Sequence, residues 1–125
     1  MLNRTFALFA VLACAALPVA AQTPAGGKEG TETELTGQVI DVNCFTMGVS
    51  GSGHKQCAQA CAKAGVSLAI LGSDGNVYIP VSSKAGDAQN SRLIAFAEGS
   101  VKVRGIHRFA NGLHTIEIKS VAAAS

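Results

Sequence analysis

The sequence predicts a small domain that is mainly β, and three observations support this prediction. Apolar and polar residues alternate over residues 35–42, which is typical of a β-strand. The dipeptides Asp74-Gly75 and Asn111-Gly112 each separate two apolar stretches, a pattern that indicates a β-hairpin. Only two short segments, residues 55–64 and 90–97, have the composition and spacing of helices.

Residues 1–21 have the three parts of a signal peptide. Arg4 supplies a positive charge, residues 6–17 form an apolar run too short to cross a bilayer comfortably, and small residues precede position 22. We expect cleavage after Ala21, giving a periplasmic or secreted protein with no transmembrane segment in the mature chain. The alternative is a lipoprotein that is cleaved before Cys14 and lipidated there.

The mature chain is small and nearly neutral. Cleavage after Ala21 leaves 104 of the 125 residues, enough for one small domain. These residues carry 9 Lys and Arg against 8 Asp and Glu, with one tyrosine and no tryptophan, so we expect no nucleic-acid partner. Residues 22–33 lack apolar periodicity and are expected to form a flexible leader, with the domain spanning residues 34–122.

A glycine-rich loop and a helix are expected after the first strand. Three glycines in residues 48–53 favour irregular structure. Lys55–Ala64 is rich in good helix formers, and Gly65 stands where a helix C-cap is expected. Cys57 and Cys61 share one face of this helix, and we expect that face to pack against the body of the domain.

The next elements are a hairpin and a short helix. Residues 68–71 and 77–81 flank the Asp-Gly turn and are expected to pair. The helix over residues 90–97 is expected to be capped by Asn90 or Ser91.

The last two strands, residues 101–109 and 113–121, flank the Asn-Gly turn. A two-residue loop places Phe109 opposite His114 and His107 opposite Ile116, so both histidines lie on the apolar face of the hairpin.

This order of elements predicts the fold class. Five strands with a helix between the third and fourth is the order of an OB-fold barrel. We therefore expect a small five-stranded OB-fold-like barrel, with one short cysteine-bearing helix after strand 1 and one short helix between strands 3 and 4.

Four segments of the chain also resemble a known group of proteins. They are Leu35–Asp41 leading to Cys44, the stretch Cys57–Gly65, the turn Asp74–Tyr78, and the final hairpin over residues 99–121. Together they resemble small exported bacterial OB-fold-like proteins of unassigned function. The resemblance implies an exported barrel with a cysteine-bearing insert after the first strand, and it implies no activity.

The mature chain contains an odd number of cysteines, which in an exported protein points to a free reactive thiol, an intermolecular bridge or a metal site. Cys44, His54, Cys57 and Cys61 lie within eighteen residues and bracket the glycine loop. Three thiolates and an imidazole suit tetrahedral zinc, and soft sulfur ligands equally suit Cu(I). We expect an exported small binding module that takes copper or zinc through these four residues.

Other roles for the same cysteines stay open. Cys44 could pair with Cys57 or Cys61 in a disulfide that staples a structural or interaction domain contacting another envelope protein. A labile thiol pair would instead make a thiol redox protein. Cys57 and His54 could form a nucleophile pair, but no third group to orient the imidazole is readable, and the usual catalytic motifs are absent. An enzyme is therefore not favoured.

His107 and His114 form a weaker, secondary candidate site. They are expected to be diagonal neighbours that share a metal or polar ligand, or that hydrogen-bond at the barrel rim. On the opposite face, Lys102, Arg104 and Arg108 form a basic stripe that either binds an acidic partner or is solvated.

Overall fold

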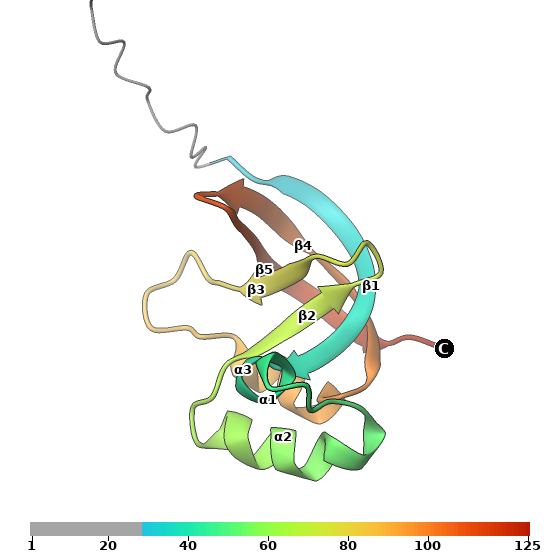
Figure 1. The fold of residues 1–125 in the computed structure, drawn as a ribbon. Coiled ribbons are helices and arrows are strands. Elements are labelled where there is room, and N and C mark those ends of the chain that lie inside the picture. The colour runs from blue at the N-terminus through green and yellow to red at the C-terminus, as the bar shows by residue number, and fades with distance from the viewer. Residues whose placement is uncertain (1–28) are drawn as a thin grey trace, which may run out of the picture.

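The structure is a computed structural model, and it describes residues 29–125. The expected signal peptide, the alternative lipidation site Cys14 and most of the expected leader lie outside the described residues. The described residues form a closed five-stranded barrel with strand order β1-β2-β3-β5-β4 (Figure 1). The strands are β1 (Thr31–Asp41), β2 (Leu68–Gly72), β3 (Val77–Pro80), β4 (Ser100–Ala110) and β5 (Leu113–Ala123). The predicted fold class, a mainly β OB-fold-like barrel, is confirmed.

The barrel closes through one parallel strand pair. Tyr78 of β3 lies beside His114 of β5, whereas all the other strand pairs are antiparallel. On the other side β1 is long enough to pair with two strands, so Gly37 is the register partner of both Gly72 and Val101. A side chain at position 37 would collide with the backbone oxygen of Leu71, so this close approach requires glycine.

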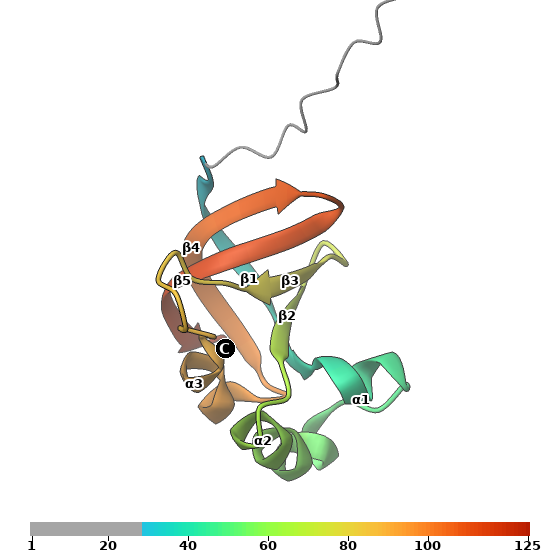
Figure 2. The same ribbon diagram turned by 90° about the vertical axis from the view of Figure 1, so that its left-hand side faces the viewer.

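The helical segments gather at one end of the barrel, and the turn between β4 and β5 lies at the other end (Figures 1 and 2). The segments are α1 (Val42–Thr46), η1 (Ser52–His54), α2 (Lys55–Lys63), α3 (Asn90–Leu93) and η2 (Ile94–Phe96). The first three form the insert between β1 and β2, and α2 packs beside η2, where Gln59 Nε2 donates to the Ile94 carbonyl over 3.0 Å. None of the helices in residues 29–125 has the length and apolar character needed to span a bilayer.

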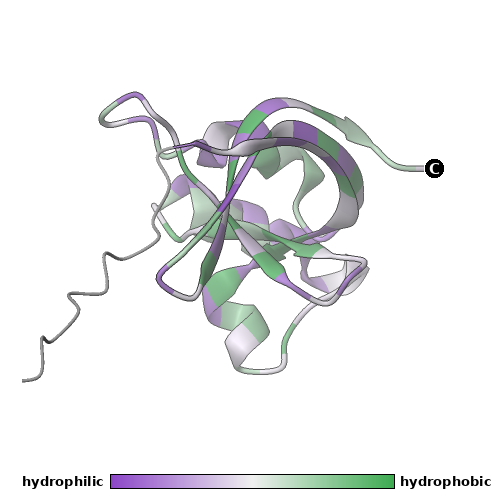
Figure 3. Ribbon diagram, turned by 90° about the horizontal axis from the view of Figure 1, so that it is seen from above, coloured by the Kyte–Doolittle hydropathy of each residue, from purple (hydrophilic) through white to green (hydrophobic). Residues whose placement is uncertain are grey.

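The core follows from the alternation of side chains along the strands, visible as bands of both colours in Figure 3. Its fully buried members are Val39, Leu68, Ile70, Leu93, Val101, Val103, Ile116 and Ile118. Leu93 contributes to this core from α3, which lies at the end of the barrel where the helical segments gather.

The register predicted for the last hairpin is confirmed. Phe109 pairs with His114 and His107 pairs with Ile116, and both turn residues have positive φ, 53° for Asn111 and 79° for Gly112. Those angles match a type I′ turn, whose twist suits two-residue hairpins.

Strand boundaries differ from expectation at three places. A register shift between Arg104 and Gly105 adds one residue to β5, which the alternation did not reveal. In addition, β1 begins at Thr31, three residues before the expected domain start, because residues 31–33 pair with β4. At the other end, β5 continues two residues past the expected end of the strand, to Ala123.

Three expectations about the helices were wrong. The sequence predicted a loop after the first strand, but a short helix, α1, follows β1 directly, because the Asp41 side chain accepts the Cys44 N–H and caps the helix. The buried face of α2 carries Ala58 and Ala62, whose small side chains allow close packing, and Cys57 is exposed.

The third is the cap of α3. Its N-cap is Gln89, in a left-handed conformation, whereas the Asn90 side chain binds the backbone of Val66 and Leu68 and so ties α3 to β2.

Candidate functional site

The insert after β1 brings the three cysteines of the described residues into one neighbourhood. Cys44 lies on α1, and Cys57 and Cys61 lie one turn apart on α2. Burial raises the pKa of the Cys61 thiol, and a hydrogen bond with Cys57 and the charges of Cys57, Asp41 and Cys44 raise it further. The pKa of Cys44 is raised by burial first, then by the charges of Asp41 and Cys57. The Cys61 thiol is therefore influenced by both other thiols, and the Cys44 thiol by Cys57.

The three cysteines of the described residues are free thiols, and none forms a disulfide. Within residues 29–125, no group of three His, Cys, Asp or Glu side chains is assembled closely enough to hold a metal ion. Cys57 is exposed, so its side chain has room to change rotamer, whereas Cys44 and Cys61 are half-buried.

Asp41 adds a carboxylate to the thiol neighbourhood, and we did not identify it from the sequence. Its side chain is fully buried, and Oδ1 accepts the Cys44 N–H over 3.0 Å. Oδ2 is buried too and has no hydrogen-bond partner among the described residues. An aspartate at the end of a strand is an N-cap signal, so its position at the start of α1 was readable. The sequence could not show that Oδ2 of Asp41 is buried without a partner, because its burial depends on the packing of the barrel.

His54 is held by a second buried carboxylate. Its Nδ1 lies 3.1 Å from Glu98 Oε1, and the two side chains are 10% and 0% exposed. Glu98 Oε2 also accepts the Gly51 N–H over 2.6 Å and Gln38 Nε2 over 3.2 Å. Glu98 thus provides the orienting group for His54 that sequence reasoning did not find. No local pattern could reveal it, because 44 residues separate the two.

The secondary candidates, His107 and His114, are direct neighbours. His107 Nε2 lies 3.0 Å from His114 Nδ1, and the rings are nearly parallel, at 6°. Tyr78 meets both imidazoles edge-on, and its hydroxyl donates to Asp74 Oδ2 over 2.7 Å. The two imidazole nitrogens that face each other form a hydrogen bond. This is the hydrogen bond at the barrel rim that the sequence analysis gave as the alternative to a shared ligand.

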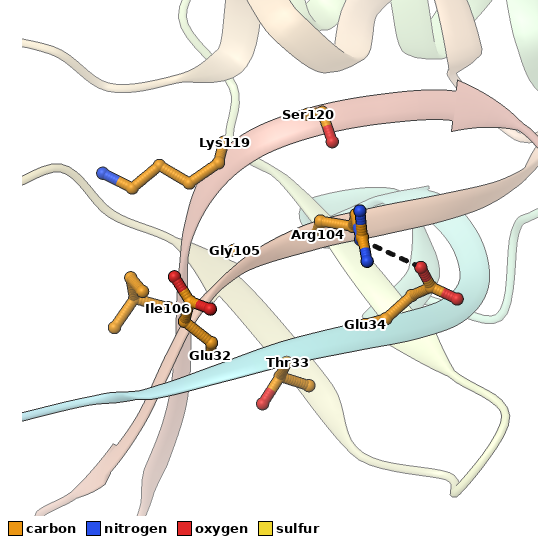
Figure 4. Close-up of a pocket in the computed structure, with 8 residues that line it drawn as sticks. All are labelled: Glu32, Thr33, Glu34, Arg104, Gly105, Ile106, Lys119 and Ser120. Carbon is orange, nitrogen blue, oxygen red and sulfur yellow. Dashed lines mark ion pairs between the residues drawn. The ribbon is translucent and has the colours of Figure 1, made fainter.

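The larger of the two hollows described on the surface lies away from the cysteines. It has a volume of about 500 Å³ and is lined by Glu32, Thr33, Glu34, Arg104, Gly105, Ile106, Lys119 and Ser120 (Figure 4). Within it Arg104 points at Glu34, with Nε 3.1 Å from the carboxylate. Glu34 also pairs with Lys102, and Arg108 pairs with Glu117. The basic stripe is therefore matched by acids of the same chain.

Comparison of the chain with protein-family models, curated proteins and solved structures found no match. The function therefore has to be argued from the chemistry of the insert and of the side chains packed around it.

Proposed function

We propose that this protein is an exported small binding module that takes a soft metal ion, copper(I) or zinc, at the thiol neighbourhood of Cys44, Cys57 and Cys61. Thiolates are the preferred protein ligands of both ions. The proposal is supported by the arrangement of the insert, which carries Cys44 on α1 and Cys57 and Cys61 one turn apart on α2, and by the influence of neighbouring thiols on the pKa values of Cys44 and Cys61.

The observation that carries the proposal is the unpartnered oxygen of Asp41. A buried carboxylate oxygen without a donor is costly, and native proteins rarely leave one in that state. A cation bound by the neighbouring thiolates would lie close to this carboxylate and offset its negative charge. A disulfide between two of the cysteines would leave Asp41 as it is, so the orphan oxygen favours a bound cation over a staple.

The test measures free thiols and metal content on one sample of the purified protein, followed by titration with Cu(I) and Zn²⁺ against competing chelators. Metal binding predicts three free thiols in the metal-stripped protein and one equivalent of bound ion. The variants Cys44→Ser, Cys57→Ser and Cys61→Ser should each weaken binding. Asn43→Ala and Gln56→Ala, at exposed positions beside Cys44 and Cys57, should not.

Two other outcomes would refute the proposal. One free thiol with no bound metal would establish a disulfide-stapled interaction domain. Three free thiols with no affinity for either ion, together with ready formation of a Cys57–Cys61 disulfide, would indicate a thiol redox protein.

A further inference from the structure

Glu98 stands at a position where its backbone is unfavourable for a residue with a side chain. Its φ is 61°, in the left-handed region that glycine adopts at low cost. The backbone is held there by two hydrogen bonds with β1, from Glu98 N to Val39 O over 2.8 Å and from Val39 N to Gly99 O over 2.9 Å. Contacts of the carboxylate must therefore offset both this conformation and complete burial.

Those contacts converge on the segment that leads into α2. The Gly51 N–H and His54 Nδ1 bind the two carboxylate oxygens separately, and Gln38 of β1 supplies the third donor. Because a carboxylate only accepts hydrogen bonds, His54 Nδ1 carries the proton in this contact. Nε2 then keeps its lone pair when the imidazole is neutral, which is the form that binds metal.

His54 directly precedes the helix that carries Cys57 and Cys61. η1 ends at His54 and α2 begins at Lys55, and His54 has right-handed helical φ and ψ of −93° and −6°. His54, Cys57 and Cys61 are therefore spaced i, i+3 and i+7 along one helical path, and residues at this spacing are neighbours on the helix surface.

We infer that Glu98 is a positioning residue, which holds His54 so that its Nε2 serves as the fourth ligand of the ion bound by Cys44, Cys57 and Cys61. This inference rests on the proposed function and narrows it. Three thiolates satisfy Cu(I), whereas structural zinc takes four ligands, so a pre-oriented imidazole selects a four-coordinate ion of the zinc class. A carboxylate hydrogen-bonded to a ligating histidine is the usual outer-shell partner in zinc sites.

The test is a double-mutant cycle on Zn²⁺ affinity, measured by chelator competition for the wild type, Glu98→Gln, His54→Ala and the double variant. We expect Glu98→Gln to weaken Zn²⁺ binding about 10- to 100-fold and His54→Ala to weaken it at least as much. In the His54→Ala background, Glu98→Gln should have no further effect on affinity. The Cu(I) affinity should be the same in all four proteins.

Gln38→Ala is the matched control, because it removes a structural donor to Glu98 and leaves the contact with His54. Its Zn²⁺ affinity should equal that of the wild type. A second readout avoids mutation: ¹⁵N NMR of the wild type should show a proton on His54 Nδ1 and a shift of Nε2 on addition of Zn²⁺. This NMR measurement on the wild type remains decisive if the Glu98→Gln variant does not fold.

Equal loss of affinity from Glu98→Gln with and without His54 would overturn the inference, since Glu98 would then act on the fold alone. Unchanged Zn²⁺ affinity in His54→Ala would also overturn it, while leaving the three-thiol site intact. Failure of the proposed function can be told apart from failure of this inference, because the wild type itself would then bind neither ion.

Discussion

A single hydrogen bond joins His107 of β4 to His114 of β5, over 3.0 Å between Nε2 and Nδ1. One imidazole donates and the other accepts, so the pair requires at least one neutral ring. The bond lies on the apolar face of the hairpin, above Ile116 and beside Tyr78. A second proton would place two positive charges at this distance in a half-buried site.

This arrangement predicts a loss of stability in mild acid. The pKa of His107 is lowered by burial first and by the charge of His114 second, and the Asp74 carboxylate opposes both effects. The unfolded chain therefore binds this proton more readily, and the free energy of unfolding should fall as pH drops below about 6.5. Urea unfolding between about pH 7 and about pH 5 measures the effect. His107→Gln should flatten the curve, and an unchanged slope would show that His107 is not responsible.

The contact between Tyr78 and Asp74 predicts a second pH effect, in stronger acid. The hydrogen bond from the Tyr78 hydroxyl is the largest cause of the lowered Asp74 pKa, which is about 2 against an ordinary value of 3.8. Stability from this contact is present above pH 3.8 and is lost as pH falls through about 2. In Tyr78→Phe, the pKa of Asp74 should rise toward 3.8, as followed by NMR titration of its carboxyl carbon. A value that stays near 2 would assign the shift to Asn76, the second donor.

The thiols should differ in reactivity. Cys57 is exposed, whereas Cys44 and Cys61 are half-buried and have raised pKa values, so less of each is thiolate at neutral pH. Brief treatment of the metal-free protein with iodoacetamide should label Cys57 first, as read by peptide mass spectrometry. Uniform labelling would mean that the insert opens faster than the reagent reacts.

Replacing Gly37 should cost substantial stability. A Cβ there would meet the backbone oxygen of Leu71, which cannot move without opening the pairing of β1 with β2. Gly37→Ala should lower the free energy of unfolding by about 1–3 kcal/mol, the usual cost of overpacking. Gly53→Ala is the control, because its Cβ would enter open space, and we expect a change within about 0.5 kcal/mol. Equal midpoints for the two variants would contradict the tight packing at Gly37.

The parts of the fold that the sequence predicted well are those set by local chemistry. Asn111-Gly112 determines a turn type, the turn determines the register, and the register places His107 and His114 on one face, so a single dipeptide predicted their proximity. The fold class followed from the succession of elements along the chain. The buried face of α2 could not be predicted, because alanine and cysteine are equally suited to burial and only the packing against η2 distinguishes them.

Only half of the candidate site could be predicted from the sequence. Its cysteines could be found by their spacing, since sulfur chemistry is visible in the residue type itself. The carboxylates could not, because Asp41 and Glu98 become unusual only through burial, which arises when strands distant in sequence close the barrel. The orientation of His54 shows the same limit, because it depends on Glu98, two residues before β4, and no local pattern connects the two residues.

The parallel pairing of β3 with β5 also has a kinetic consequence. Tyr78 pairs with His114 and Thr31 pairs with His107, so the barrel cannot close until almost the whole chain has been synthesised. Contacts between such distant segments make folding slow, on the order of milliseconds to seconds. A chain whose barrel cannot close during synthesis can pass through a narrow channel before it folds. Pairing of β5 with β3 and β4 then completes the fold.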